Sequence, residues 1–129
     1  MEKWELVPNI SIGKIYFGMS RDKVHKLFDA ECKEFKKSKF SKNTSDDYGK
    51  FHIFYTSDDK VDAVEIFENI KISLNGKEIF PIKTSDIEKN IPGIFNEDGT
   101  YTHKEYSIGL ESNGDNVESI LLGAKGYYD

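Results

Sequence analysis

The chain has 129 residues, of which 37% are hydrophobic and 32% charged, and its formal net charge is -5 at pH 7. This length suits one domain, and the apolar content argues against disorder. No stretch reaches the roughly 20 apolar residues of a bilayer span, no secretory leader is apparent, and Cys32 has no second cysteine for a disulfide or a thiolate cage. We therefore expect one cytoplasmic domain over residues 1–129 that does not engage a membrane.

The N-terminal part of the sequence predicts a strand followed by a helix. Residues 10–17 have apolar side chains at strand spacing, with Gly13 as a bend. Ser20 can accept a hydrogen bond from the first turn of a helix near residues 20–30. The apolar residues of that helix recur at helical spacing and would face the core: Val24, Leu27 and Phe28.

The middle of the chain predicts a loop and then a pair of strands. The lysine-rich stretch over residues 33–45 breaks the apolar pattern and is expected to be a solvated loop. Residues 51–55 and 61–67 are rich in apolar and aromatic side chains, and only a short turn separates them. The short connection favours an antiparallel pair.

The C-terminal half predicts two more hairpins with a helix between them. Asn75-Gly76 lies between two alternating apolar runs, which is a strong hairpin signal. Ser85, followed three residues later by Glu88, predicts a capping box for a short helix over residues 84–91. Asn113-Gly114 then predicts the turn between the last two strands.

These elements indicate an internal repeat. Residues 13–28 align with residues 76–91 at a constant offset of 63, and Phe51 aligns with Tyr106 at an offset of 55. After one insertion, Val64 aligns with Ile120. The sequence thus predicts a single-domain α+β fold with a mainly antiparallel sheet, two or three short helices on one face, and a strand-helix-strand-strand unit that occurs twice, over residues 10–67 and 72–122.

No catalytic motif or complete metal site is evident in the sequence. The three histidines stand in unrelated settings, and no serine lies in a nucleophile elbow. Residues 94–105 are similar to a calcium loop, but Ile94 occupies the first ligand position, where an aspartate should stand. We interpret Asp98-Gly99 within this segment as a turn. The expectation is a protein that is not an enzyme and that holds no cofactor or metal.

Charge is distributed unevenly along the chain. Residues 1–42 carry a balance of +4, from 10 Lys+Arg and 6 Asp+Glu, whereas residues 43–129 carry -9, from 8 and 17. Most of the positive surplus lies in Lys33, Lys36, Lys37, Lys39 and Lys42. The acidic remainder would repel phosphates, so we do not expect nucleic-acid binding. The acidic part is either a solubility feature or a face for a basic partner.

The segment Ile10-x-Ile-Gly-x-Ile-x-Phe-Gly-Met-Ser-Arg-Asp-x-Val24 resembles the opening of small bacterial proteins that share a Gly-Met-Ser-Arg-Glu-x-Val helix start. One branch looks like BamE and the tandem-repeat β-lactamase inhibitor proteins, in which short helices pack on a sheet that binds another protein. The chain lacks the lipoprotein signal and the Leu-Gly-x-Pro of the BamE branch. Its size, acidic balance and closing Gly-Tyr-Tyr-Asp129 are similar to immunity proteins paired with bacterial polymorphic and contact-dependent growth inhibition toxins.

The resemblance to immunity proteins implies a cytoplasmic protein that binds and neutralises a cognate toxin domain. Such toxins are often nucleases with basic, phosphate-holding surfaces, which an acidic partner can cover. We expect the partner-binding residues in three acidic pairs that project from loops or turns: Asp46 and Asp47, Asp58 and Asp59, and Glu97 and Asp98. The alternative is a non-catalytic tandem-repeat module that binds a small molecule or a host-cell protein.

Overall fold

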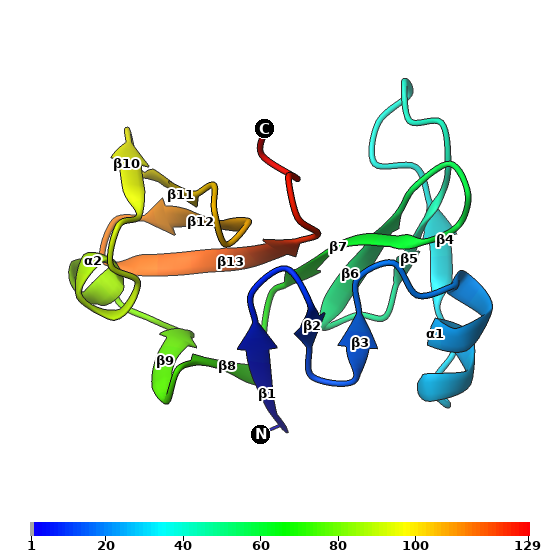
Figure 1. Cartoon of the computed structure of the whole chain (residues 1–129), viewed down its shortest axis with the longest axis horizontal. Helices are drawn as coiled ribbons and strands as arrows, with labels where there is room; N and C mark the ends of the chain where they lie inside the picture. The colour runs from blue at the N-terminus through cyan, green and yellow to red at the C-terminus, as the bar shows by residue number, and fades with distance from the viewer. Residues whose placement is uncertain (1) are drawn as a thin grey trace.

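Two packed β-sheets make up the computed structural model, which describes residues 2–129 (Figure 1). The smaller sheet has five strands, in the order β3 (Ile15–Tyr16), β2 (Ser11–Ile12), β1 (Glu2–Val7), β8 (Ile70–Leu74) and β9 (Lys77–Phe80). The larger sheet has eight strands, in the order β10 (Phe95–Glu97), β11 (Thr100–His103), β12 (Ile108–Asn113), β13 (Asn116–Gly123), β7 (Val61–Ile66), β6 (Phe51–Tyr55), β5 (Ser45–Asp47) and β4 (Lys33–Phe35). All neighbouring strands are antiparallel except β1 and β8, which are parallel.

Helices contribute little to this fold, and the α+β prediction is wrong. Strands account for 48% of the structure and helices for 11%. The helical segments are α1 (Arg21–Leu27) and α2 (Ile87–Asn90), the latter preceded by the 3-10 turn η1 (Thr84–Asp86). The two α-helices lie at opposite ends of the molecule instead of side by side on one face (Figure 1). None of the helices in residues 2–129 is long and apolar enough to cross a membrane.

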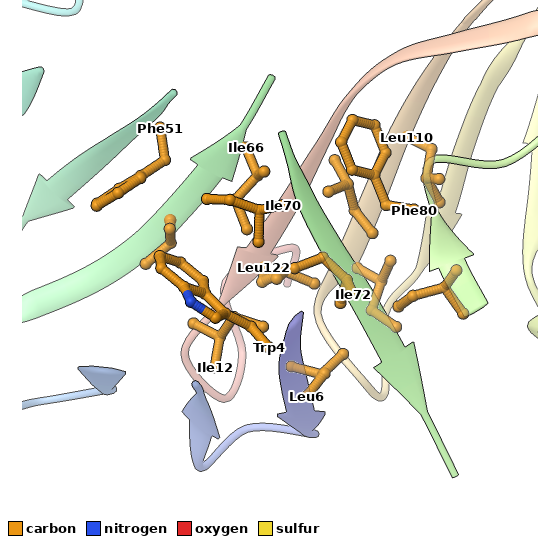
Figure 2. Close-up of a cluster of buried hydrophobic side chains, with 14 of the residues drawn as sticks. Trp4, Leu6, Ile12, Phe51, Ile66, Ile70, Ile72, Phe80, Leu110 and Leu122 are labelled. Atoms are coloured by element: carbon orange, nitrogen blue, oxygen red, sulfur yellow. The ribbon is translucent and has the colours of Figure 1, made fainter. Parts of the chain in front are cut away.

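The smaller sheet takes the place that the predicted helices were expected to occupy. Trp4, Leu6, Ile70 and Ile72 point from the smaller sheet toward side chains of the larger sheet (Figure 2). One continuous cluster of buried side chains includes residues from both sheets. The alternating apolar residues of each strand are therefore buried against another sheet, which is the arrangement of a β-sandwich.

Residues 10–17 form a tight hairpin instead of one bent strand. Ile12 pairs with Ile15, so Gly13 and Lys14 are the two turn residues. Gly13 has a φ of +58°, and a Cβ atom at this position would lie 2.9 Å from Cγ of Trp4. Glycine therefore suits both the turn conformation and the close approach of the indole ring.

Charged strands at the two edges of the larger sheet were not predicted from the sequence. The lysine-rich stretch contains β4, which is the last strand at one edge of the larger sheet, and leads into β5. Strands at an edge accept charged side chains because one side faces water. At the opposite edge, β10 and β11 form a hairpin around Asp98-Gly99, whose φ values of 52° and 88° confirm the predicted turn.

Several local predictions are confirmed. β6 pairs with β7, β8 with β9 around Asn75-Gly76, and β12 with β13 around the turn after Asn113. The Ser20 hydroxyl accepts from the backbone N–H of Lys23 and caps α1. The predicted Ser85 cap is wrong, because no side chain caps η1 or α2.

The two halves of the chain have the same order of elements, but the repeating unit is longer than predicted. A hairpin (β2–β3 or β8–β9), a helix (α1 or α2) and a four-stranded meander (β4–β7 or β10–β13) occur in turn. The meanders meet where β7 pairs with β13. A row of consecutive Cα partners crosses the six central strands of the larger sheet, from β5 to β11: Asp46, Ile53, Val64, Leu122, Ile108 and His103. This row makes Leu122, and not Ile120, the counterpart of Val64.

The C-terminal tail packs on two glycines of the strands β12 and β13. A Cβ atom on Gly109 would overlap the Tyr128 hydroxyl, and one on Gly123 would lie 2.6 Å from Cβ of Tyr127. The Tyr127 hydroxyl also accepts from Lys37 Nζ at 3.1 Å. The tail therefore connects β12 and β13 with the lysine-rich segment of the first half.

Candidate functional site

Asp46, on β5, is the centre of a buried polar network. Its side chain is fully buried, and its Oδ1 atom lies 2.7 Å from Nη2 of Arg21. His25 Nε2 and the Tyr55 hydroxyl each lie 2.7 Å from Oδ2. Both carboxylate oxygens therefore have hydrogen-bond partners, which is the condition for burying a charged group.

The glycine-containing motif before α1 positions the basic members of this network. The N–H of Gly18 donates to the carbonyl of Val61, and the N–H of Val61 donates to the carbonyl of Met19, at 2.8 and 2.9 Å. Both bonds fix the start of α1 against β7. Arg21 and His25 are one helical turn apart, so both side chains reach the adjacent β5.

The network keeps Asp46 ionised and Tyr55 protonated. Burial on its own would raise the pKa of Asp46, but the hydrogen bonds from Arg21, Tyr55 and His25 outweigh it and hold this pKa below its usual value. Burial and the hydrogen bond to Asp46 raise the pKa of Tyr55. Tyr55 therefore remains a donor to the carboxylate throughout the physiological pH range.

The structure divides the three acidic pairs predicted as a partner surface between two places, because Asp46 and Asp59 both contact Arg21, whereas Glu97 and Asp98 lie at β10. Asp46 was expected to project from a loop, but it lies in a strand and is fully buried because Arg21 draws it inward. Asp47 is half-buried and lies 3.3 Å from His52. Asp59 is exposed, but its carboxylate accepts from Arg21 and Asn43, and these bonds lower its pKa.

Three of the six predicted residues are exposed and make no side-chain ion pair within residues 2–129: Asp58, Glu97 and Asp98. Asp58 is in the β6–β7 turn, whereas Glu97 ends β10 and Asp98 follows it. Asp58 therefore belongs to the β4–β7 meander and the other two to the β10–β13 meander. The six residues do not form one continuous acidic surface.

The β10 edge combines these acidic residues with an exposed aromatic ring. β10 is the last strand of the larger sheet, and among residues 2–129 it pairs only with β11, so its other backbone edge has no partner strand there. All three residues of β10 are exposed, and Phe95 has 64% of its surface accessible. An open strand edge with an exposed phenylalanine is a typical protein-binding feature.

An open hollow of about 900 Å³ lies beside this edge. Phe95, Tyr106 and Tyr128 contribute aromatic rings to its lining, and Glu97 and Glu105 contribute carboxylates. His103, also in the lining, stacks on Tyr106 at 4.2 Å between ring centroids. We define the β10 surface as Phe95, Glu97, Asp98 and Glu105 together with this hollow.

The histidines do not form a catalytic triad with Cys32. The Cys32 Sγ atom lies 3.9 Å from His25 Nε2, but the same nitrogen already contacts Asp46. In a triad the nucleophile and the carboxylate contact different ring nitrogens, so that a proton passes across the imidazole. Burial, the largest influence, raises the pKa of Cys32, which favours the thiol over the reactive thiolate.

Sequence reasoning missed the network around Asp46 because its members are far apart in the chain. Asp46 lies 25 residues from Arg21 and 9 residues from Tyr55. A usable signal was present on α1, where Arg21 and His25 flank the buried Val24 on the inner side of the helix. Two basic residues next to a buried position imply an acidic partner in the core.

No family model matches this chain, and no match was found among curated proteins or solved structures.

Proposed function

We propose that this chain is an immunity protein that binds a basic toxin domain in the cytoplasm and blocks it without chemistry of its own. The observation that carries the proposal is the β10 surface, where an open strand edge and an exposed phenylalanine lie next to Glu97 and Asp98. The resemblance to immunity proteins in size, acidic balance and the closing Gly-Tyr-Tyr-Asp129 supports the same function. The chain from residue 43 onward, which contains the β10 surface, has a balance of -9.

Each part of the β10 surface has a distinct role in this proposal. The free backbone edge of β10 can pair with a strand of the partner, and those hydrogen bonds provide affinity. Phe95 can enter an apolar pocket of the partner, as central aromatic residues do in many interfaces. Glu97, Asp98 and Glu105 attract a basic surface and accelerate association.

The opposite edge of the larger sheet is a weaker candidate for binding a basic partner. β4 carries Lys33 and is followed by further lysines. Its aromatic residue, Phe35, is partly buried and lies 4.6 Å from the His52 ring. Lys37 lies 4.3 Å from the centre of the Phe54 ring and donates to Tyr127. The β4 edge is therefore rich in lysine, and its Phe35 and the nearby Lys37 contact other parts of the chain.

The test uses the toxin domain encoded by the gene adjacent to this one. Phe95→Ala should weaken binding at least about tenfold, because truncation of a central aromatic residue costs 2 kcal/mol or more. Phe40→Ala is the matched control, since Phe40 is 82% exposed in the β4–β5 loop, away from β10. Replacement of Glu97 and Asp98 by serine should slow association and weaken its dependence on salt.

Two results would contradict the proposal at different levels. If the wild-type chain neither binds the adjacent toxin domain nor restores growth of cells that express it, the immunity function is wrong. If the wild-type chain binds but Phe95→Ala and Phe40→Ala behave alike, the function stands and the β10 surface is wrong.

A second candidate function is a module that binds a small molecule or a host-cell protein. The hollow beside β10 favours it, because about 900 Å³ lies within the usual size range of ligand sites. A small aromatic ligand in this hollow would change the environment of Tyr106 and Tyr128. Ligand-detected NMR with a library of aromatic fragments separates the two functions. A small-molecule module should bind some fragments saturably in this hollow, whereas a surface specific for a toxin should bind none of them saturably.

A further inference from the structure

Three potential metal ligands converge beneath α1. His25 comes from α1, Cys32 from the segment between α1 and β4, and Asp46 from β5. One ligand atom from each lies within 4.8 Å of the others. The His25 Nε2 atom is 2.7 Å from Asp46 Oδ2 and 3.9 Å from Cys32 Sγ. Imidazole, thiolate and carboxylate are the three ligand types that zinc prefers in proteins.

We propose that His25, Cys32 and Asp46 bind a zinc ion. Tetrahedral zinc with ordinary bond lengths places neighbouring ligand atoms about 3.3 to 3.6 Å apart. Zinc at this site would move Cys32 and His25 closer by a few tenths of an ångström and separate His25 from Asp46 by about half an ångström. Side-chain rotations of this size are within the reach of His25 and Cys32, neither of which is fully buried.

The surroundings already hold the ligand atoms as outer-shell groups do in zinc proteins. Arg21 Nη2 donates to Asp46 Oδ1 at 2.7 Å. The Tyr55 hydroxyl donates to Oδ2, the oxygen that also contacts His25. Such contacts orient a ligating carboxylate and stabilise its charge. Arg21 is itself paired with both Asp46 and Asp59, so it does not leave an unpaired cation beside the metal.

A buried hydroxyl provides an independent observation. The oxygen of Tyr48 is buried and has no hydrogen-bond partner within residues 2–129, and the Cys32 thiol lies next to it. A thiolate on zinc is a better acceptor than a neutral thiol, and Tyr48 is placed to donate to it.

Zinc binding also assigns a role to Cys32 that the hydrogen-bond network does not. Without a metal, His25 Nε2 contacts Asp46 Oδ2 at 2.7 Å, and the Cys32 sulfur lies farther from the same nitrogen, at 3.9 Å. Zinc takes the place of the proton between His25 and Asp46, and that proton moves to His25 Nδ1 by exchange with solvent. Cys32 loses its thiol proton to solvent as the sulfur–zinc bond forms. The fourth zinc position is then left for a water molecule.

The experiment uses the full chain, stripped with a chelator and titrated with cobalt(II) and then with zinc(II). One equivalent of cobalt should give a thiolate-to-cobalt charge-transfer band and the intense visible absorption of tetrahedral cobalt, and zinc should displace both. Cys32→Ser should abolish the charge-transfer band. His25→Gln should weaken binding by more than about 100-fold, because even outer-shell changes cost 10- to 100-fold.

His52→Gln is the matched control. His52 Nε2 lies 3.3 Å from Asp47, so it is a second histidine–aspartate pair, but the metal-ligand group found in residues 2–129 does not include it. His52→Gln should bind cobalt as the wild type does, and circular dichroism should show all three variants folded. Absence of the charge-transfer band in the wild type overturns the proposal. Equal affinities of His25→Gln and His52→Gln also overturn it.

Discussion

The two halves of the chain place different chemistry at equivalent points of the same sheet. Asp46 and His103 occupy the two ends of the row of residues that crosses the central strands of the larger sheet. Asp46 is ionised and is held by donors from α1 and β6. His103 instead stacks on Tyr106 and accepts from its backbone N–H at 3.1 Å. One end of the sheet therefore depends on charge, and the other on stacking and a neutral hydrogen bond.

The helices differ in the same way. α1 buries Arg21 next to Val24, whereas α2 buries Ile87 and is followed by the buried Ile91 and Ile94. An isoleucine is stabilised by any close-packed apolar surroundings, but a buried guanidinium needs an acceptor at a fixed place. A shared strand order therefore does not determine how a helix is attached to the sheet. It also indicates that the first half tolerates fewer substitutions at its attachment point.

The largest effect is expected from Asp46→Asn. This substitution keeps the shape of the side chain but removes the charge that balances Arg21, and breaking a buried pair in this way costs about 3 kcal/mol. Urea unfolding should show the loss. Asp47→Asn is the neighbouring control and should cost less than about 1 kcal/mol, because Asp47 is half-buried. Equal losses for the two variants would contradict the importance of the buried pair.

The free energy of unfolding should also depend on pH through Asp46, with a smaller change than the one caused by Asp46→Asn. The pKa of Asp46 is lower in the folded chain than its usual value, so its contribution is complete above about pH 4 and is lost as the pH falls through the folded-state pKa. Unfolding free energies measured from pH 6 down to pH 2 should fall more steeply for the wild type than for Asp46→Asn. Parallel curves would exclude Asp46 as the source of acid sensitivity.

The contact between the tail and the sheet should have an intermediate effect. Gly109→Ala places a Cβ atom against the Tyr128 hydroxyl, so the tail must move, at a cost of about 2 kcal/mol. In a background that carries Tyr128→Ala the clash is absent, and Gly109→Ala should then lower the free energy of unfolding much less. A thermodynamic cycle over the four proteins measures this coupling. Additive losses would mean that Tyr128 does not pack on Gly109.

The smallest effect is expected at the other end of the row. His103→Gln removes the stacked ring and its neutral hydrogen bond, and should cost about 1 kcal/mol. The same urea experiment provides the direct comparison with Asp46→Asn. If His103→Gln lowers the free energy of unfolding as much as Asp46→Asn does, the two positions contribute equally to stability and do not differ as proposed.

Sequence patterns predicted features set by neighbouring residues. Asn75-Gly76 and Asp98-Gly99 supply the left-handed backbone that tight hairpins need, and Ser20 supplies a cap for the first helical turn. These features depend on a few consecutive residues. The prediction of a helical layer failed because alternating apolar residues indicate a buried strand face but not whether a helix or a second sheet covers it.

The candidate site was less predictable for a related reason. Asp46 stands in a polar stretch and was assigned to the surface, although it is the most deeply buried acid of residues 2–129. Its burial depends on Arg21, His25 and Tyr55, and no local pattern connects these residues with it. Glu97 and Asp98 were assigned to the surface for the same compositional reason and are exposed. Polar composition does not distinguish these two outcomes.

The position of β1 has a consequence for synthesis on the ribosome. β1 is parallel to β8, and Trp4 pairs with Ile72, which is made 68 residues later. At about 5 to 20 residues per second, this interval lasts about 3 to 14 seconds. During that time β2 can pair with one edge of β1, and Trp4 can contact Phe28 and Phe51, but the other edge of β1 has no partner strand. Nascent chains stalled before residue 70 should therefore bind chaperones through this strand, and chains extended beyond β9 should release them.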